Sequence, residues 1–168
     1  MKEQIEIKSL RERILLKDLL DTQPNLTQIV YTSYEGNDKF DATWVQWHHT
    51  HKAAMRVIAE VKVRNYPTTA YNGWLIEKDK YDYLMAQPHE KILYINFHPD
   101  GIQVWDLRKV DEPKWIESIL PKNNQGDEDK IKVNGDLMSS DAETITKEIK
   151  IFEALDNARK IYNKRNGK

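Results

Sequence analysis

The fold is decided by one stretch of alternating side chains, Arg56-Val57-Ile58-Ala59-Glu60-Val61-Lys62-Val63-Arg64. Successive side chains of a β-strand point to opposite faces of the sheet, so every second residue shares a face. One face is apolar, whereas the other carries Glu60 and Lys62, about 7 Å apart along the strand. We therefore predict a strand at 54–64 with one buried face and one face that presents an acid beside a lysine.

The residues before this stretch predict two further strands, at 28–34 and 40–47, with turns at 35–38 and 48–52. Three consecutive antiparallel strands result. Pairing around a turn near residue 50 sets Asp41 opposite residues 59–60, so we expect the carboxyl groups of Asp41 and Glu60 to be neighbours.

Helical spacing of apolar residues predicts a first helix at 9–21, opened by a capping box from Ser9 to Glu12. A second helix is predicted at 75–87, followed by a hairpin of strands at 92–97 and 101–107. The order is α-β-β-β-α-β-β, which predicts an α/β protein with a mixed, mostly antiparallel sheet flanked by helices.

The remaining residues predict an extension of this core. Residues 1–110 form the expected core, and residues 111–168 a loop-rich extension within the same domain. The extension has a short strand at 130–133 and a C-terminal helix opened by a second capping box, Ser140-Asp141-Ala142-Glu143.

Composition excludes several classes of protein. The chain has 168 residues, enough for one domain with a core, and no cysteine, which excludes disulfides and thiolate sites and agrees with a cytoplasmic location. No apolar run approaches the roughly 18 residues that span a bilayer, and the first residues form no signal segment, so we expect no membrane partner. The net charge is -1, so any contact with nucleic acid must come from local basic clusters.

Asp41, Glu60 and Lys62 are the candidate catalytic residues. Mg²⁺ is usually bound by one or two carboxylates together with waters and phosphate oxygens, and it acidifies a bound water. A lysine one strand-step away orients or deprotonates that water, or stabilises the transition state. The structural alternative is an exposed Glu–Lys pair on a strand and an aspartate that caps a turn.

With Asp41 on the second strand and Glu60-Val61-Lys62 on the third, residues 9–107 resemble the PD-(D/E)XK nuclease superfamily. The segment 73–84 and the hairpin at 94–107 are similar to its small, often phage-encoded members. The residue before Asp41 is Phe40 instead of the motif's proline, a departure that many members share. The resemblance implies a restriction-endonuclease-like core.

The resemblance also implies a role for individual residues. Asp41, Glu60 and the backbone carbonyl of Val61 would bind the metal ion, and Lys62 would be the catalytic lysine. Members often add an acid from the first helix, which here is Glu12 or Asp18. For Glu12 the capping box is an equally good explanation, because a carboxylate bonded to the helix start is poorly free to bind a metal.

Further residues are candidates for contact with the substrate. Lys80 occupies a position where relatives carry a lysine or glutamine that faces the site, although a solvated helix lysine is the simpler interpretation. Arg56 and Arg64 are expected to contact phosphate, and Tyr66 lies in the loop beyond the strand with Tyr71 and Trp74.

These residues predict a Mg²⁺-dependent nuclease or endonuclease that hydrolyses DNA, with Mn²⁺ as a substitute metal. The alternative is a non-catalytic nucleic-acid-binding or virion/assembly protein that retains the nuclease fold. A third possibility is a zinc protein that uses His48, His49 and His51, although no fourth ligand stands at a recognisable spacing. The sequence leaves open whether the protein works as a homodimer.

Overall fold

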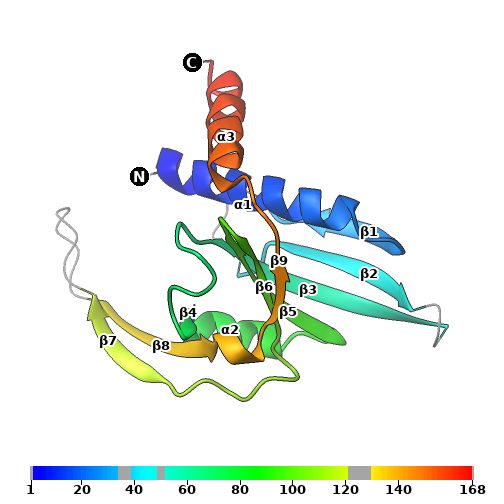
Figure 1. Cartoon of the computed structure of the whole chain (residues 1–168), viewed down its shortest axis with the longest axis vertical. Helices are drawn as coiled ribbons and strands as arrows, with labels where there is room; N and C mark the ends of the chain where they lie inside the picture. The colour runs from blue at the N-terminus through cyan, green and yellow to red at the C-terminus, as the bar shows by residue number, and fades with distance from the viewer. Residues whose placement is uncertain (1, 34–38, 49–51, 121–129, 168) are drawn as a thin grey trace.

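A computed structural model describes residues 2–33, 39–48, 52–120 and 130–167. It has α/β architecture, with a six-stranded mixed sheet in the order β1-β2-β3-β5-β6-β9 and a three-stranded antiparallel sheet in the order β4-β8-β7 (Figure 1). The elements are α1 (Lys2–Asp21), β1 (Leu26–Tyr31), β2 (Ala42–His48), β3 (Ala53–Val63), β4 (Gly73–Glu77), α2 (Lys78–Met85), β5 (Lys91–His98), β6 (Gly101–Asp106), β7 (Ile116–Leu120), β8 (Lys130–Met138), the 3-10 helix η1 (Ser139–Asp141), β9 (Glu143–Thr146) and α3 (Ile151–Arg165).

Strand β3 lies inside the large sheet, between β2 and β5. It pairs antiparallel with β2, as predicted, and parallel with β5. Parallel strands need a crossover connection, which β4 and α2 provide. The mixed, mostly antiparallel sheet expected from the sequence is therefore confirmed.

Both faces of β3 are buried, so the prediction of a single buried face is wrong. Val57, Ala59 and Val61 pack in one apolar cluster, whereas Ile58 packs in a second cluster on the other face. Glu60, on the same face as Ile58, is only 1% exposed. The period of two is correct, but other elements also cover the polar face.

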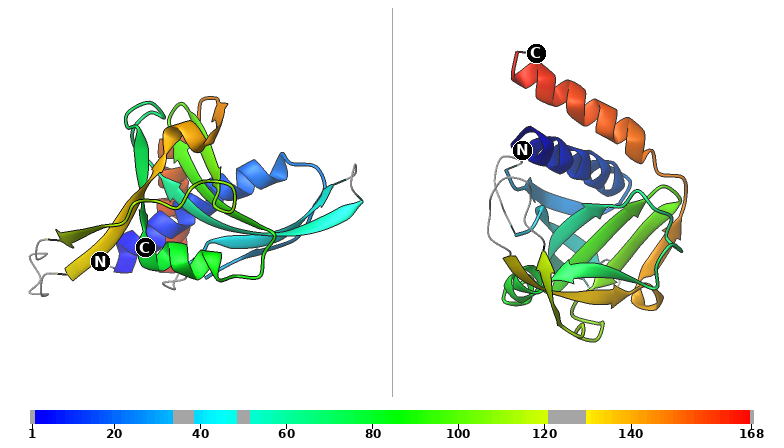
Figure 2. Two further views of the ribbon diagram at one scale, coloured as in Figure 1. Left: turned by 90° about the horizontal axis from the view of Figure 1, so that it is seen from below. Right: turned by 90° about the vertical axis from the view of Figure 1, so that its left-hand side faces the viewer.

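Helix α1 covers the first face of the sheet, and α3 packs against α1 (Figure 2). Leu15, Leu16 and Leu20 of α1 pack there with Ile151 and Ala154 of α3. A polar contact joins the same helices, because the Arg11 side chain donates a hydrogen bond to the Ile151 carbonyl at 2.8 Å. The C-terminal helix is thus tied to the sheet through α1.

Helix α2 and the small sheet cover the second face. Trp74 and Ile76 of β4, Leu84 of α2 and Leu137 of β8 pack against Tyr94 and its neighbours on the large sheet. This layer lies over the face of β3 that carries Glu60, which explains why an acid on that face is buried.

Both predictions of a capping box at the start of a helix are wrong. Helix α1 begins at Lys2, so Ser9 and Glu12 lie inside it, although its end at Asp21 is as predicted. Around the second box, η1 and β9 occupy 139–146, and α3 begins at Ile151. In both places the four-residue pattern is local, whereas the position of the helix depends on packing.

The helix predicted at 75–87 begins later, because its first residues form strand β4. Trp74 and Ile76 are buried while Leu75 is exposed, an alternation that fits a strand. The partner of β4 is β8, which extends the short strand predicted at 130–133 to Lys130–Met138. The other strand of this sheet, β7, lies in a segment predicted as loop.

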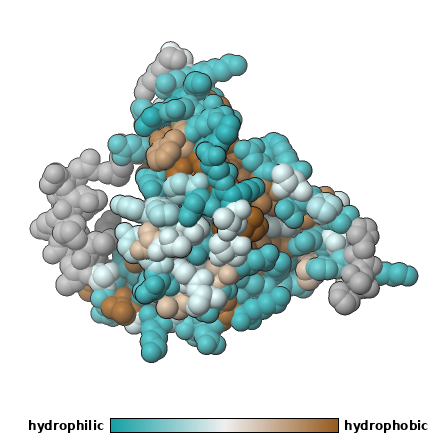
Figure 3. All heavy atoms as spheres, viewed as in Figure 1, coloured by the Kyte–Doolittle hydropathy of each residue, from teal (hydrophilic) through white to brown (hydrophobic). Residues whose placement is uncertain are grey.

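Hydrophilic side chains cover most of the face seen in Figure 3, with smaller apolar patches between them. None of the helices in the described ranges combines the length and the apolar character that a membrane span requires.

The packing of α1 on the sheet predicts the effect of one truncation. Leu16 is 0% exposed, and Leu16→Ala should lower the free energy of unfolding by about 2–5 kcal/mol because it leaves a cavity. The matched control is Leu75→Ala, at a side chain that is 48% exposed. Urea denaturation measures both changes, and equal costs would contradict the described packing.

Candidate active site

Asp41 lies where the ladder between β2 and β3 ends. The last paired residues are Ala42 and Ala59, and Asp41 continues the contact with its own backbone and side chain. Its N–H donates to the Ala59 carbonyl at 2.8 Å, and its Oδ2 accepts from the Val61 N–H at 2.7 Å. Thr32 donates its N–H to the Asp41 carbonyl at 3.0 Å, so the residue is fixed from both sides. The predicted proximity of Asp41 to the Glu60 region is confirmed.

Glu60 is the least exposed acid of the site. Its side chain is 2% exposed, and the Oε1 atom accepts hydrogen bonds from the ammonium groups of both Lys62 and Lys80. The two lysine side chains are themselves only 21% and 18% exposed. A buried charge needs a partner of opposite sign, which explains why two cations converge on one carboxylate.

Lys80 comes from the first turns of α2, far from Glu60 in the sequence. The interpretation of Lys80 as an ordinary solvated lysine is therefore wrong, and the structure brings it to the predicted site. Lys78 shows the contrast, because two residues earlier its ammonium pairs with the exposed carboxylate of Asp82 at 2.6 Å.

Glu12 extends from α1 toward the same group of residues. It is 4% exposed, and its Oε1 has no hydrogen-bond partner among the described residues. Because α1 begins at Lys2, the carboxylate of Glu12 does not cap the helix. The structure therefore contradicts the alternative in which Glu12 belongs to a capping box. The Glu12 carboxylate interacts electrostatically with Lys62 and Glu60 instead.

The electrostatics of the site reflect burial and shared charge. Burial, reinforced by the negative charges of Glu60 and Glu12, raises the pKa of Asp41 to about 8. Burial also raises the pKa of Glu12, although the Lys62 ammonium opposes this shift. For Lys62, burial lowers the pKa, but the carboxylates of Glu60 and Glu12 outweigh it and hold the pKa above its ordinary value.

The acids fit a hard divalent cation by their chemistry. Mg²⁺ needs only one or two carboxylates, with waters and substrate oxygens as further ligands. Asp41, Glu60 and Glu12 supply carboxylates that repel one another, and Glu12 has an oxygen without a partner. Within the described ranges, no group of three or more His, Asp or Glu side chains forms a ready-made metal cage. The role of the Val61 carbonyl as a ligand stays a prediction.

The other predicted contact residues lie in different environments. Arg56 is paired with Glu90, with 2.8 Å between Nη2 and Oε1, and both side chains are exposed. Arg64 lies over the Trp74 ring, 5.4 Å from its centroid, and donates to the Tyr94 hydroxyl at 3.3 Å. Tyr66 is 56% exposed, and its ring meets that of Tyr71 edge to face at 5.8 Å. Their contact with a substrate stays a prediction.

The histidine cluster is only partly described. His48 is the last residue of β2, whereas His49 and His51 lie outside the described residues.

Sequence reasoning missed a set of buried polar residues beside the site. Asn96 pairs with Lys62 across β3 and β5, and Gln103 pairs with Asn96 across β5 and β6. Asn96 and His98 are 0% exposed, and Gln103 is 3% exposed. The available signal was the appearance of polar residues at every second position in otherwise apolar strands.

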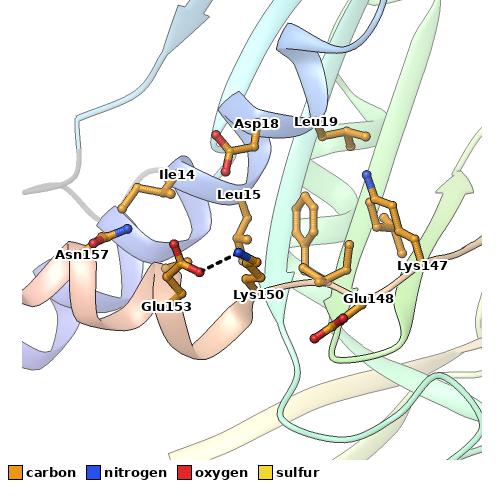
Figure 4. Close-up of a pocket in the computed structure, with 13 residues that line it drawn as sticks. Ile14, Leu15, Asp18, Leu19, Lys147, Glu148, Lys150, Glu153 and Asn157 are labelled. Atoms are coloured by element: carbon orange, nitrogen blue, oxygen red, sulfur yellow. Dashed lines mark ion pairs between the residues drawn. The ribbon is translucent and has the colours of Figure 1, made fainter.

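A separate cavity of about 230 Å³ lies between α1, α3 and the segment 147–150 (Figure 4). Lys150 and Glu153 form an ion pair of 3.2 Å at its mouth. Its lining includes Asp18 and Phe97, and Phe97 belongs to the sheet face opposite Glu60. The alternative acid Asp18 is therefore not part of the group around Lys62.

Comparison with known proteins finds no match, whether among family models, curated proteins or solved structures. The assignment of a function therefore depends on the residues of the site.

The raised pKa of Asp41 predicts how stability depends on pH in the metal-free protein. The folded state keeps a proton that the unfolded state releases between the ordinary pKa of 3.8 and about 8. Stability in EDTA should therefore fall as pH rises through this window. Thermal unfolding at several pH values measures the slope, and Asp41→Asn should flatten it. Equal slopes for the two proteins would contradict the assignment.

Proposed function

We propose that the protein is a Mg²⁺-dependent nuclease that hydrolyses phosphodiester bonds of DNA, with Mn²⁺ as a substitute metal. The observation that carries the proposal is the convergence of Lys62 and Lys80 on the buried carboxylate of Glu60, beside Asp41. A purely structural strand gains little from burying this acid, because desolvation of an ion pair costs about as much as its attraction returns.

The arrangement of elements supports the same proposal. Helix α1 precedes three antiparallel strands, and α2 precedes β5, which is parallel to β3. This order is compatible with the restriction-endonuclease-like core that we propose. Strand β4, between β3 and α2, is an addition to the expected order.

The chain's residues would divide the chemistry between them. Asp41 and Glu60, with Glu12 as a third acid, would hold the metal ion, which supplies charge neutralisation at the phosphate and an acidified water. Lys62 would orient the attacking water or stabilise the charge that develops in the transition state. Lys80, which extends from α2, would contact the phosphate once Glu60 binds the metal ion.

The role of Lys62 predicts a loss of cleavage without a loss of metal binding. Lys62→Ala should reduce cleavage of DNA in Mg²⁺ by at least about 100-fold, because it removes the group that we propose to orient the attacking water. The matched control is Lys17→Ala, since the Lys17 side chain is 60% exposed and lies on α1.

Cleavage is measured on single-stranded, duplex and branched DNA, and Mn²⁺ binding is measured by calorimetry. Unreduced cleavage by the Lys62 variant would overturn the assignment. Binding of DNA by the wild-type protein without cleavage of any substrate would favour the non-catalytic alternative.

Replacing Glu12 should raise the stability of the metal-free protein and lower its affinity for the metal ion. Glu12→Gln removes a buried charge with little change of shape, so the metal-free protein should unfold at a higher temperature. The same change should weaken Mn²⁺ binding measured by calorimetry, because a carboxylate near the ion is lost. Lower stability together with unchanged Mn²⁺ affinity would show that Glu12 has only a structural role.

A further inference from the structure

A cavity of about 550 Å³ lies where the loop after β3, the end of β8 and strands β6 and β9 meet. Figure 2 shows these segments, far apart in the sequence, gathered at one end of the large sheet. Pockets that bind small organic groups have volumes of about 300–1,000 Å³, so the cavity has a suitable size.

The cavity is lined by uncharged side chains. Its polar groups come from Thr68, Asn72, Gln103, Ser139 and Thr144 and other hydroxyls, and among the described residues no Asp, Glu, Lys, Arg or His lines it. Recognition of phosphate or of a metal ion relies on charged groups. A neutral ligand with several hydrogen-bonding groups therefore fits the cavity better than either of these.

The cavity lies on the face of the sheet that carries Glu60 and Lys62. Lys62 pairs with Asn96, Asn96 pairs with Gln103, and Gln103 pairs with Thr144. Residues paired across neighbouring strands share a face, and strands are about 4.8 Å apart, so Gln103 lies about 10 Å from Lys62 across the sheet. A single nucleotide can therefore reach from the lysines to the cavity.

Buried polar side chains lie at the floor of the cavity and beside it. Gln103 is 3% exposed, and its side chain interacts with the buried imidazole of His98. Neither amide atom of Asn96, the neighbour of Gln103 on β5, has a hydrogen-bond partner among the described residues. Buried amides without partners are rare and costly, so they indicate a group that completes their hydrogen bonds.

Aromatic side chains stand at the rim. Tyr71 lines the cavity and is 51% exposed, with its ring 5.1 Å from that of Trp74 and in contact with Tyr66. Exposed aromatic rings stack on nucleobases in a way that tolerates any base. Hydrogen-bonding amides below a stacking surface are the features with which proteins bind an unstacked base.

We propose that this cavity binds one nucleobase of a DNA strand whose adjacent phosphate contacts Lys62 and Lys80. Gln103 forms the floor of this base pocket and Tyr71 its rim. The proposal rests on the proposed function for the position of the phosphate, and it narrows the substrate to DNA with an unpaired or displaced base. The base pocket itself requires no metal ion and no cleavage.

Binding in EDTA tests the base pocket in the full-length protein. Fluorescence anisotropy compares a short labelled DNA strand with a strand of the same length whose nucleotides are all abasic. Wild-type protein should bind the base-bearing strand about tenfold more tightly. Gln103→Leu, which removes the amide with little loss of volume, should abolish most of this preference.

Two further variants complete the design. Gln46→Leu is the matched control, because it makes the same change on β2. Gln46 shares a sheet face with Ala42 and Trp44, which is the face opposite the cavity, so this variant should keep the preference. Asn72→Ala, at the exposed rim, should weaken the preference without any effect on the core, so the test does not depend on the folding of the Gln103 variant.

Equal binding of the two strands by the wild-type protein would overturn the base pocket, as would a preference that survives both Gln103→Leu and Asn72→Ala. Because the assay contains no metal ion, its result is separate from that of the cleavage assay. Cleavage without a preference for the base-bearing strand would support the nuclease and overturn the base pocket. A preference without cleavage would support the base pocket and overturn the nuclease.

Discussion

The buried carboxylate of Glu60, with two lysine ammonium groups on one oxygen, is the interaction on which the rest of the structure depends. An ionised acid away from water is stable only beside compensating charge. Lys62 supplies one cation from the same strand, but Lys80 reaches Glu60 only because α2 lies over this face of the sheet. The crossover from β3 to β5 therefore does more than connect two parallel strands, since it delivers one of the two cations that contact the acid.

The two faces of β3 have different roles: the side chains of one pack in an apolar core, and those of the other include Glu60 and Lys62. The side chains of Val57, Ala59 and Val61 contact the apolar layer formed with α1 and α3, and from this side Glu12 of α1 interacts electrostatically with Glu60 and Lys62. The other face holds Glu60 and Lys62 next to the buried amides of Asn96 and Gln103. A row of polar side chains from the lysines to an uncharged cavity suits a ligand with a charged part and a neutral part, which is the chemical description of a nucleotide.

Local patterns in the sequence predicted the strand that carries the acid and lysine and the position of Asp41 opposite it, because hairpin pairing depends on neighbours in the chain. They failed where distant segments decide. The first residues of the helix predicted at 75–87 belong to β4 instead, because β8 offers a partner strand. The capping boxes at Ser9 and Ser140 were too short to locate a helix. The role of Lys80 at Glu60 and the contact between α1 and α3 needed the tertiary structure.

The proposed chemistry requires that Asp41 and Glu60 share one metal ion beside Lys62. Anomalous scattering from crystals soaked in Mn²⁺ locates such an ion directly. We expect a single strong peak within coordination distance of carboxylate oxygens of both residues, about 2.0–2.1 Å for a cation of the size of Mg²⁺, with an ammonium group displaced from Glu60. Crystals that show no peak at this place, with Lys62 and Lys80 both still on Glu60, would contradict it.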